Sequence, residues 1–152
     1  MSPRPYNLGI RKAVAEESRR RVLDAAKQLL ASGSAYEHFT VDTVAAHADV
    51  SRQTVYHQFH SKRGLLESML DVMAQDAGLI EGIIKFRSQT DCLGALSVFT
   101  DTFCRFWGEN RETISKLTAV AALHPELALA LKERRKRRSE NVEVLANMVA
   151  AE

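Results

Sequence analysis

Apolar residues recur at helical spacing along most of this chain, and no stretch alternates in the way a strand would. In residues 15–31, Val22, Ala26, Leu29 and Leu30 fall on one helical face, and the Ser-Gly-Ser sequence at 32–34 is expected to end that helix. Further helices are predicted at residues 62–78, 91–108, 111–123 and 125–152, with an irregular stretch at 79–90. The predicted fold is therefore all-α.

Two short helices with clear entry signals are predicted between residues 40 and 59. Thr40 is a good N-cap for the first, and Phe39 and Val44 have the spacing of a hydrophobic staple around it. Asp42 in the first turn suits the helix dipole. Ser51 begins the second helix, where the staple spacing is repeated. A tight turn at 47–50 joins the two, so the segment has the order of a helix-turn-helix.

The second short helix presents a polar face that suits duplex DNA. Arg52 can fork onto guanine and Gln53 onto adenine in the major groove, with Tyr56 and His57 on the same face. Hydroxyls and cations at helix starts suit phosphate oxygens. The predicted DNA-binding residues are Thr40, Ser51, Arg52, Gln53, Thr54, Tyr56, His57 and Lys62. The alternative for each residue taken singly is an ordinary solvated helix face, but the caps, staples and turn together favour DNA binding.

The same residues carry a resemblance to a known family. TVDTVA at 40–45, ADVSRQTVYHQFHSK at 48–62 and VLDAA at 22–26 look like the DNA-binding segment of the TetR (tetracycline-repressor-like) regulators, over residues 19–70. The pattern Thr-x-Tyr-x-x-Phe-x-x-Lys, at 54–62, makes this resemblance specific. It implies that positions like Arg52 and Gln53 meet bases. The sequence departs from the family at Asp49, where the family usually has glycine. Asp tolerates a left-handed backbone in the turn, although less easily than glycine does.

The resemblance also implies a second, variable helical domain that often binds a small molecule. We expect a flexible basic arm at 1–14, a helix-turn-helix domain at 15–61 and a helical ligand and dimerisation domain at 62–152. The expected ligand-binding residues are Met69, Phe99, Phe103 and Trp107, although their spacing fits plain core packing equally. Family members dimerise through two helices after the seventh, and these are expected to be missing from this chain.

Composition and charge narrow the picture further. Residues 1–65 hold ten Lys and Arg against six Asp and Glu, whereas residues 66–152 hold eleven against thirteen, so the basic half coincides with the predicted DNA-binding segment. Cys92 and Cys104 give neither a disulfide framework nor a metal site, and a reduced, cytoplasmic setting is expected. The sequence shows no apolar run that spans a membrane and no signal core. His124 is expected to be structural, and the basic run at 132–138 a solvated helix face, with a second nucleic-acid patch as the alternative.

These observations lead to one principal functional hypothesis. No nucleotide loop, nucleophile motif or metal-ligand spacing is found, so an enzyme is not expected, and no cofactor or metal is predicted. The expected function is a homodimeric transcriptional repressor that binds a palindromic double-stranded DNA operator and is released by a small-molecule effector. The alternatives are a transcriptional activator with the same helix-turn-helix and a helical protein-interaction module.

Overall fold

The computed structural model describes residues 8–32 and 39–151, in which every regular element is a helix, as predicted. The helices are α1 (Leu8–Ala31), α3 (Val41–His47), α4 (Arg52–Phe59), α5 (Lys62–Asp76), α6 (Leu79–Arg87), α7 (Cys92–Ala122) and α8 (Pro125–Ala151). None of them combines the length and the apolar character needed to cross a bilayer.

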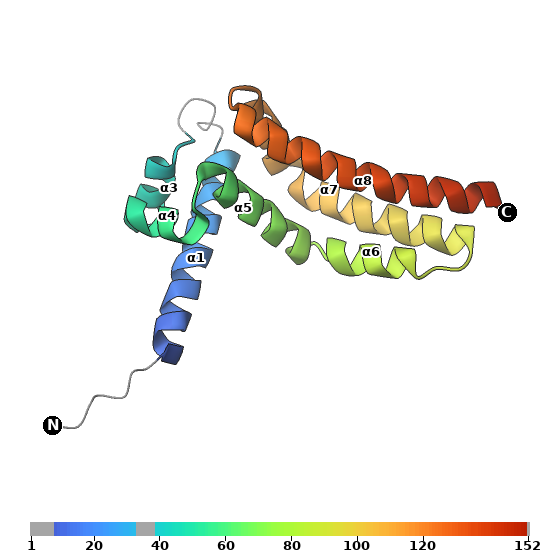
Figure 1. Cartoon of the computed structure of the whole chain (residues 1–152), viewed down its shortest axis with the longest axis horizontal. Coiled ribbons are helices and arrows are strands. Elements are labelled where there is room, and N and C mark those ends of the chain that lie inside the picture. Colours follow the sequence, from blue (N-terminus) through green and yellow to red (C-terminus); the bar gives the residue numbers. More distant parts are fainter. Residues whose placement is uncertain (1–7, 33–38, 152) are drawn as a thin grey trace.

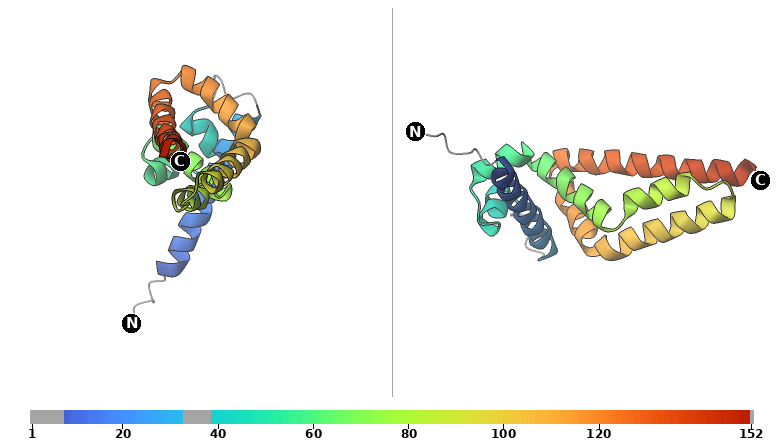
Figure 2. Two further views of the ribbon diagram at one scale, coloured as in Figure 1. Left: turned by 90° about the vertical axis from the view of Figure 1, so that its right-hand side faces the viewer. Right: turned by 90° about the horizontal axis from the view of Figure 1, so that it is seen from below.

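The molecule is elongated, with a compact group of helices at one end. Helices α1, α3 and α4 and the beginning of α5 form that end, and α6, α7 and α8 extend away from it (Figure 1). Helix α7 runs back along α6 and packs against α8 as well, so the three make a narrow bundle when seen from two further sides (Figure 2). Helix α5 connects the two parts.

One hydrophobic core lies where the two parts meet. Its centre is contributed by α1, α3, α4 and α5, and the C-terminal end of α7 and the beginning of α8 close it. Its fully buried members include Val22, Leu30, Val44, Leu65, Leu66, Leu117, Val120 and Leu127. Because α5 supplies Leu65 and Leu66 to this core, the short helices before it are held in place by the helix that follows them.

Helix α1 is longer than the sequence predicted. It begins at Leu8 rather than near residue 15, so residues 8–14 of the expected flexible arm are helical. The stretch lies downstream of Pro3 and Pro5, and it is free of proline, which is the residue that excludes helix most strongly. The rest of the arm and the expected end signal at 33–34 lie outside the described residues.

Helix α6 corrects the expectation of an irregular stretch at 79–90. Gly78 has φ 64°, a left-handed conformation that ends α5 and turns the chain into α6. Phe86 on α6 is 1% exposed, and its ring lies 5.3 Å from that of Phe99 on α7. Gly82 faces Thr102 so closely that an added Cβ would overlap it. Packing against α7 therefore stabilises a helix that local sequence signals did not reveal.

Helix α7 joins the two helices predicted at 91–108 and 111–123 into one. Gly108 costs an internal helix position only about 1 kcal/mol relative to alanine, which is too little to end a long helix. Asn110 is 4% exposed, and its side-chain amide donates to the carbonyl oxygen of Phe106 at 2.9 Å. The polar group is thus satisfied within the helix. The break predicted before Pro125 is confirmed, since α7 ends at Ala122 and α8 begins at Pro125.

Candidate nucleic-acid interface

Local capping bonds hold the two short helices at their predicted starts. The Thr40 hydroxyl accepts from the backbone N–H of Thr43 at 3.1 Å, and the Thr43 hydroxyl accepts from the backbone N–H of Thr40 at 3.0 Å. The Ser51 hydroxyl accepts from the backbone N–H of Thr54 at 3.0 Å. These bonds satisfy N–H groups that have no partner inside the helix. Both N-caps predicted from the sequence are therefore confirmed.

The turn between α3 and α4 has the backbone that its sequence position requires. Asp49 has φ 52°, so it occupies the left-handed region where the TetR-like pattern usually has glycine. The backbone N–H of Val50 donates to the carbonyl oxygen of Ala45 at 3.0 Å and closes the turn. Asp49 is exposed, and it adds a negative charge beside α4.

Helix α4 divides into an anchored side and an exposed side, as its sequence predicted. Val55 is 1% exposed and Phe59 is 3% exposed, and both belong to the core. The opposite side carries the exposed residues Arg52, Gln53, Tyr56 and His57. Thr54 is half-buried beside its cap. A rigid helix therefore presents a row of hydrogen-bonding side chains to solvent, which is the geometry that major-groove contact requires.

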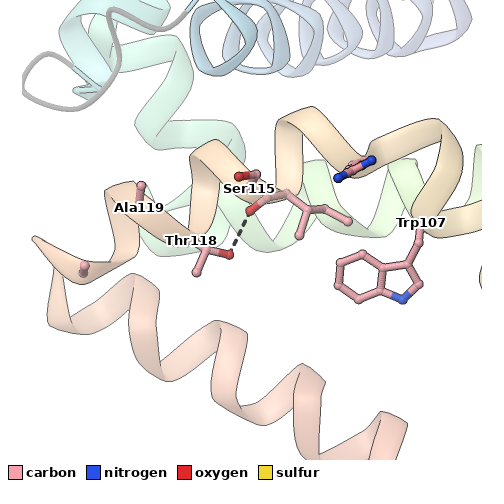
Figure 3. A pocket seen from close by; sticks show the side chains of 7 residues that line it. Trp107, Ser115, Thr118 and Ala119 are labelled. Atoms are coloured by element: carbon pink, nitrogen blue, oxygen red, sulfur yellow. Dashed lines mark hydrogen bonds between the residues drawn. The ribbon is translucent and has the colours of Figure 1, made fainter.

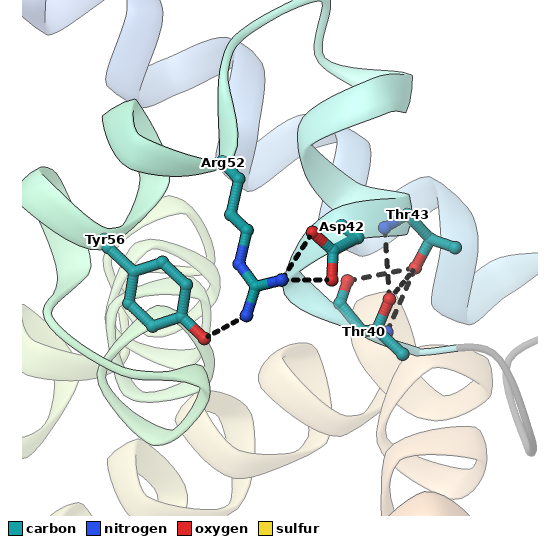
Figure 4. Close-up of polar contacts among 5 residues, drawn as sticks. All are labelled: Thr40, Asp42, Thr43, Arg52 and Tyr56. Atoms are coloured by element: carbon teal, nitrogen blue, oxygen red, sulfur yellow. Dashed lines mark hydrogen bonds and ion pairs between the residues drawn. The ribbon is translucent and has the colours of Figure 1, made fainter.

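Arg52 does not extend freely into solvent. Its Nη1 donates to both carboxylate oxygens of Asp42, at 3.1 Å each, and its Nη2 donates to the hydroxyl of Tyr56 at 3.5 Å (Figure 4). The guanidinium carbon also lies 5.3 Å from the centre of the Tyr56 ring. Sequence reasoning placed Asp42 in the first turn of α3 for its effect on the dipole, and it missed this ion pair. No periodic pattern links two residues that lie in different helices.

Arg19 on α1 is a second residue whose role the sequence did not reveal. Its Nη1 donates to the carbonyl oxygen of Gln58 at 3.1 Å, and its Nη2 donates to the hydroxyl of Ser68 at 3.0 Å. The guanidinium carbon lies 4.5 Å from the centre of the Phe59 ring. Arg19 thus connects α1 with the C-terminal end of α4 and with α5, and these contacts help to fix the orientation of α4.

Lys62 is less exposed than a simple phosphate anchor would be. It begins α5, as predicted, but its ammonium group lies 3.2 Å from Nε2 of His124, in the connection between α7 and α8. It also lies 5.4 Å from the centre of the Phe39 ring. Burial lowers the pKa of Lys62, and the charge of Glu126 partly opposes this. His124, for which the sequence suggested no partner, is thus part of a polar junction between the two parts of the molecule.

Two further arginines strengthen this junction between α5 and α8. Arg63 donates to Glu67 on its own helix and to Glu133 on α8, at 2.8 Å in both cases. Arg134 on α8 donates to the carbonyl oxygen of Glu67 at 2.9 Å and to the carboxylate of Asp71 at 2.5 Å. Part of the basic run at 132–138 therefore faces α5 rather than solvent.

The four predicted ligand-binding residues do not line one cavity. Met69, on α5, is 2% exposed and lies in the hydrophobic core. Phe99 and Phe103 are half-buried with ring centres 4.5 Å apart, and Phe99 also packs against Phe86. Trp107 instead lies at an open groove of about 620 Å³ that is lined by residues of α7 (Figure 3). The structure thus brings two of the four together and separates the others.

The groove at Trp107 is lined largely by apolar side chains, and two arginines lie at or near it. Ile114, Ala119 and Ala122 contribute apolar surface, and Arg111 adds a positive charge. The guanidinium carbon of Arg138, on α8, lies 5.1 Å from the centre of the Trp107 ring. A second depression of about 470 Å³ adjoins it between α7 and α8, since Thr118 and Ala122 line both.

Comparisons with known proteins concern the N-terminal part. Residues 22–69 match the family described as bacterial regulatory proteins, tetR family. The chain is also similar to a protein of Bacillus subtilis (strain 168) described as an uncharacterized HTH-type transcriptional regulator, YvkB, with 38% identity over 61 residues. That similarity covers 40% of this chain and 32% of the length of the relative, so about a third of that protein is represented. No solved structure matches the chain.

Proposed function

We propose that this protein is a transcriptional regulator that binds specific DNA sequences through α4, because residues 22–69 match the family described as bacterial regulatory proteins, tetR family. The exposed side of α4 carries the proposal. It presents Arg52, Gln53, Tyr56 and His57 from a helix whose other side is anchored by Val55 and Phe59. Arg52 and Gln53 contact base edges, and hydroxyls at Thr40, Ser51 and Thr54 and the ammonium of Lys62 contact phosphates.

Selection of duplexes from a random pool by the purified protein tests this function. An enriched sequence, bound more tightly than a scrambled duplex and with an affinity that falls as salt rises, is the expected result. Arg52→Ala should weaken binding to the enriched sequence by about 1–3 kcal/mol and change binding to the scrambled duplex little. Arg137→Ala removes the same charge from an exposed position on α8 and is the matched control. Failure to enrich any sequence would overturn the proposal.

Lys62 tests the division between base and phosphate contacts. Lys62→Ala should weaken binding to both duplexes alike and reduce the slope of affinity against salt by about one unit. Because Lys62 also contacts His124, thermal unfolding of the variant is measured alongside binding. Equal losses for Arg52→Ala and Lys62→Ala on both duplexes would contradict the assignment of roles.

A homodimer on a palindromic operator is part of the same proposal. Two copies of α4, about one DNA turn apart, would read two half-sites. Exposed apolar side chains on α6, α7 and α8, among them Ile84 and Leu93, support association. Sedimentation of the protein alone and on the enriched duplex measures the number of copies. An enriched sequence without a repeated half-site, bound by one copy, would contradict the dimer.

We further propose that the regulator is a repressor released by a small apolar effector at α7. Phe99 and Phe103 lie on α7, and Trp107 is the only tryptophan of the chain, so its fluorescence reports binding there directly. Release requires that the effector favour an arrangement that binds DNA less well. The contacts of Lys62 and Arg63 with His124 and Glu133 connect α7 and α8 to α5.

Compounds that change Trp107 fluorescence are then tested for DNA release, and compounds that bind there but release no DNA would contradict the effector role. Gene expression from the operator distinguishes repression from activation.

A further inference from the structure

The carboxylate of Asp42 lies on the side of the molecule that is proposed to face DNA. Its side chain is 59% exposed, and that of its partner Arg52 is 60% exposed. Asp42 belongs to α3 and Arg52 to α4, so the pair crosses from one short helix to the other (Figure 4). A negative charge at this position is unfavourable beside phosphates unless a cation accompanies it.

The ion pair between Asp42 and Arg52 is expected to add little to the stability of the fold. Ion pairs between exposed side chains contribute little to stability, and α3 and α4 are already fixed by their caps and by the core. The two helices keep their starts through Thr40 and Ser51, not through Asp42. The effect of Asp42 is therefore expected in what Arg52 does rather than in whether the domain folds.

The contacts of Arg52 fix the orientation of its guanidinium, and the nearby carboxylate partly offsets its positive charge. Two bonds to Asp42 hold Nη1, and Tyr56 lies against the same group through its ring and its hydroxyl. A long side chain that is already held loses less conformational freedom when it meets a base. The adjacent carboxylate also offsets the attraction of Arg52 to phosphates, which is the part of the interaction that carries no sequence information.

We propose that Asp42 is a positioning residue that makes Arg52 selective for base edges by holding its guanidinium and reducing its attraction to the DNA backbone. This inference rests on the proposed DNA-binding function. It gives Asp42 a role in specificity, although a carboxylate alone would weaken DNA binding. The proposed target of Arg52 is the edge of a guanine base, which accepts two parallel N–H donors from arginine.

The variant Asp42→Asn tests the proposal in the full chain. It keeps the size of the side chain, removes its charge and leaves one acceptor oxygen instead of two, so the Arg52 guanidinium is held less firmly. We expect tighter binding to a scrambled duplex and a ratio of specific to non-specific affinity that falls about five- to tenfold, within the range for one base contact. Replacing guanines of the enriched site by 7-deazaguanine, which lacks the N7 acceptor, should cost the variant less than the original protein.

Asp49→Asn is the matched control. Asp49 is exposed near α4 and loses the same charge, and asparagine tolerates its left-handed backbone. This change should raise affinity for both duplexes alike and leave their ratio unchanged. If Asp42→Asn behaves in the same way, the carboxylate acts only through general repulsion and the inference is overturned, although DNA binding stands. If no duplex is bound by any of the three proteins, the proposed function itself fails.

A double-mutant cycle separates positioning from direct contact. Asp42→Asn should change the affinity ratio in the original protein and leave it unchanged in the Arg52→Ala background, because its effect passes through Arg52. An equal change in both backgrounds would mean that Asp42 contacts a base itself, for instance the amino group of cytosine, and the positioning role would be wrong.

Discussion

The two parts of the molecule use their apolar side chains differently. Around α1, α3, α4 and α5 nearly every large apolar side chain is buried in one core, and the exposed ones include Tyr56, which lies on the candidate DNA surface. Of the twelve large hydrophobic side chains exposed in the described part of the chain, ten lie beyond residue 70. They are Val72, Ile80, Ile84, Leu93, Leu96, Trp107, Leu123, Leu129, Val142 and Val149.

This difference separates a part whose apolar side chains are mostly buried in the core that it shares with the ends of α7 and α8 from a part that leaves many of them exposed. The first has its helix starts capped and its interior filled, so its exposed side is free to be polar. The second is held by α5 and by polar contacts at the junction, while α6, α7 and α8 keep apolar side chains in solvent. Exposed apolar side chains in this number suit the association and effector binding proposed above if they adjoin one another.

The largest expected effect compares the two parts directly. Phe59→Ala removes a ring that is 3% exposed and should lower the free energy of unfolding by about 3–5 kcal/mol. Leu93→Ala removes a side chain that is 78% exposed and should change it by less than about 0.5 kcal/mol. Urea denaturation measures both. A large loss for Leu93→Ala would mean that this surface is already covered in solution, and the comparison would fail.

A smaller effect of opposite sign is expected at two glycines. A Cβ at Gly64, in the first turn of α5, would overlap the carbonyl oxygen of Phe59, so Gly64→Ala should destabilise the protein by about 1–3 kcal/mol. At Gly108 in α7 an added Cβ meets open space, and Gly108→Ala should stabilise by up to about 1 kcal/mol. Thermal melts of the two variants decide this. Stabilisation at Gly64 would contradict the close packing of α4 on α5.

The junction between the parts should contribute less. A double-mutant cycle on Arg63 and Glu133, whose side chains are 33% and 50% exposed, should give a coupling of about 0.2–1 kcal/mol. The local pair of Arg20 and Glu17, at 70% and 57% exposed, is the control and should give less. A coupling of zero at the junction would indicate that the parts are held by the shared core alone.

The smallest expected effect is a pH dependence at Lys62. Because burial lowers its pKa in the folded protein, the folded state releases this proton at a lower pH than the unfolded chain. The free energy of unfolding should therefore gain a rising contribution between the lowered pKa and the ordinary lysine value of about 10.4. Lys62→Met should remove that rise, whereas Lys132→Met, at an exposed lysine on α8, should leave it. Parallel pH profiles for Lys62→Met and the original protein would contradict the burial.

The sequence alone was sufficient for the all-α fold, the tetR resemblance and the starts of α3, α4, α5 and α8. Thr40, Ser51 and Ser61 each bond to a backbone N–H three residues later, so their capping roles can be recognised from neighbouring residues. The same holds for Val55 and Phe59, which share one side of a short helix, and for Asp49, whose left-handed conformation follows from its place in the turn.

Tertiary structure decided the features that join residues far apart in the chain. Asp42 meets Arg52 because α3 and α4 cross, and Lys62 meets His124 because α7 and α8 return to α5. Helix α6 and the unbroken α7 depend on packing between them, which outweighed the local signals for irregular structure at 79–90 and for a break near Gly108. Periodicity reports which face of a helix is apolar. The neighbour that covers the face, or the charge that meets it from another helix, depends on how the chain closes in three dimensions.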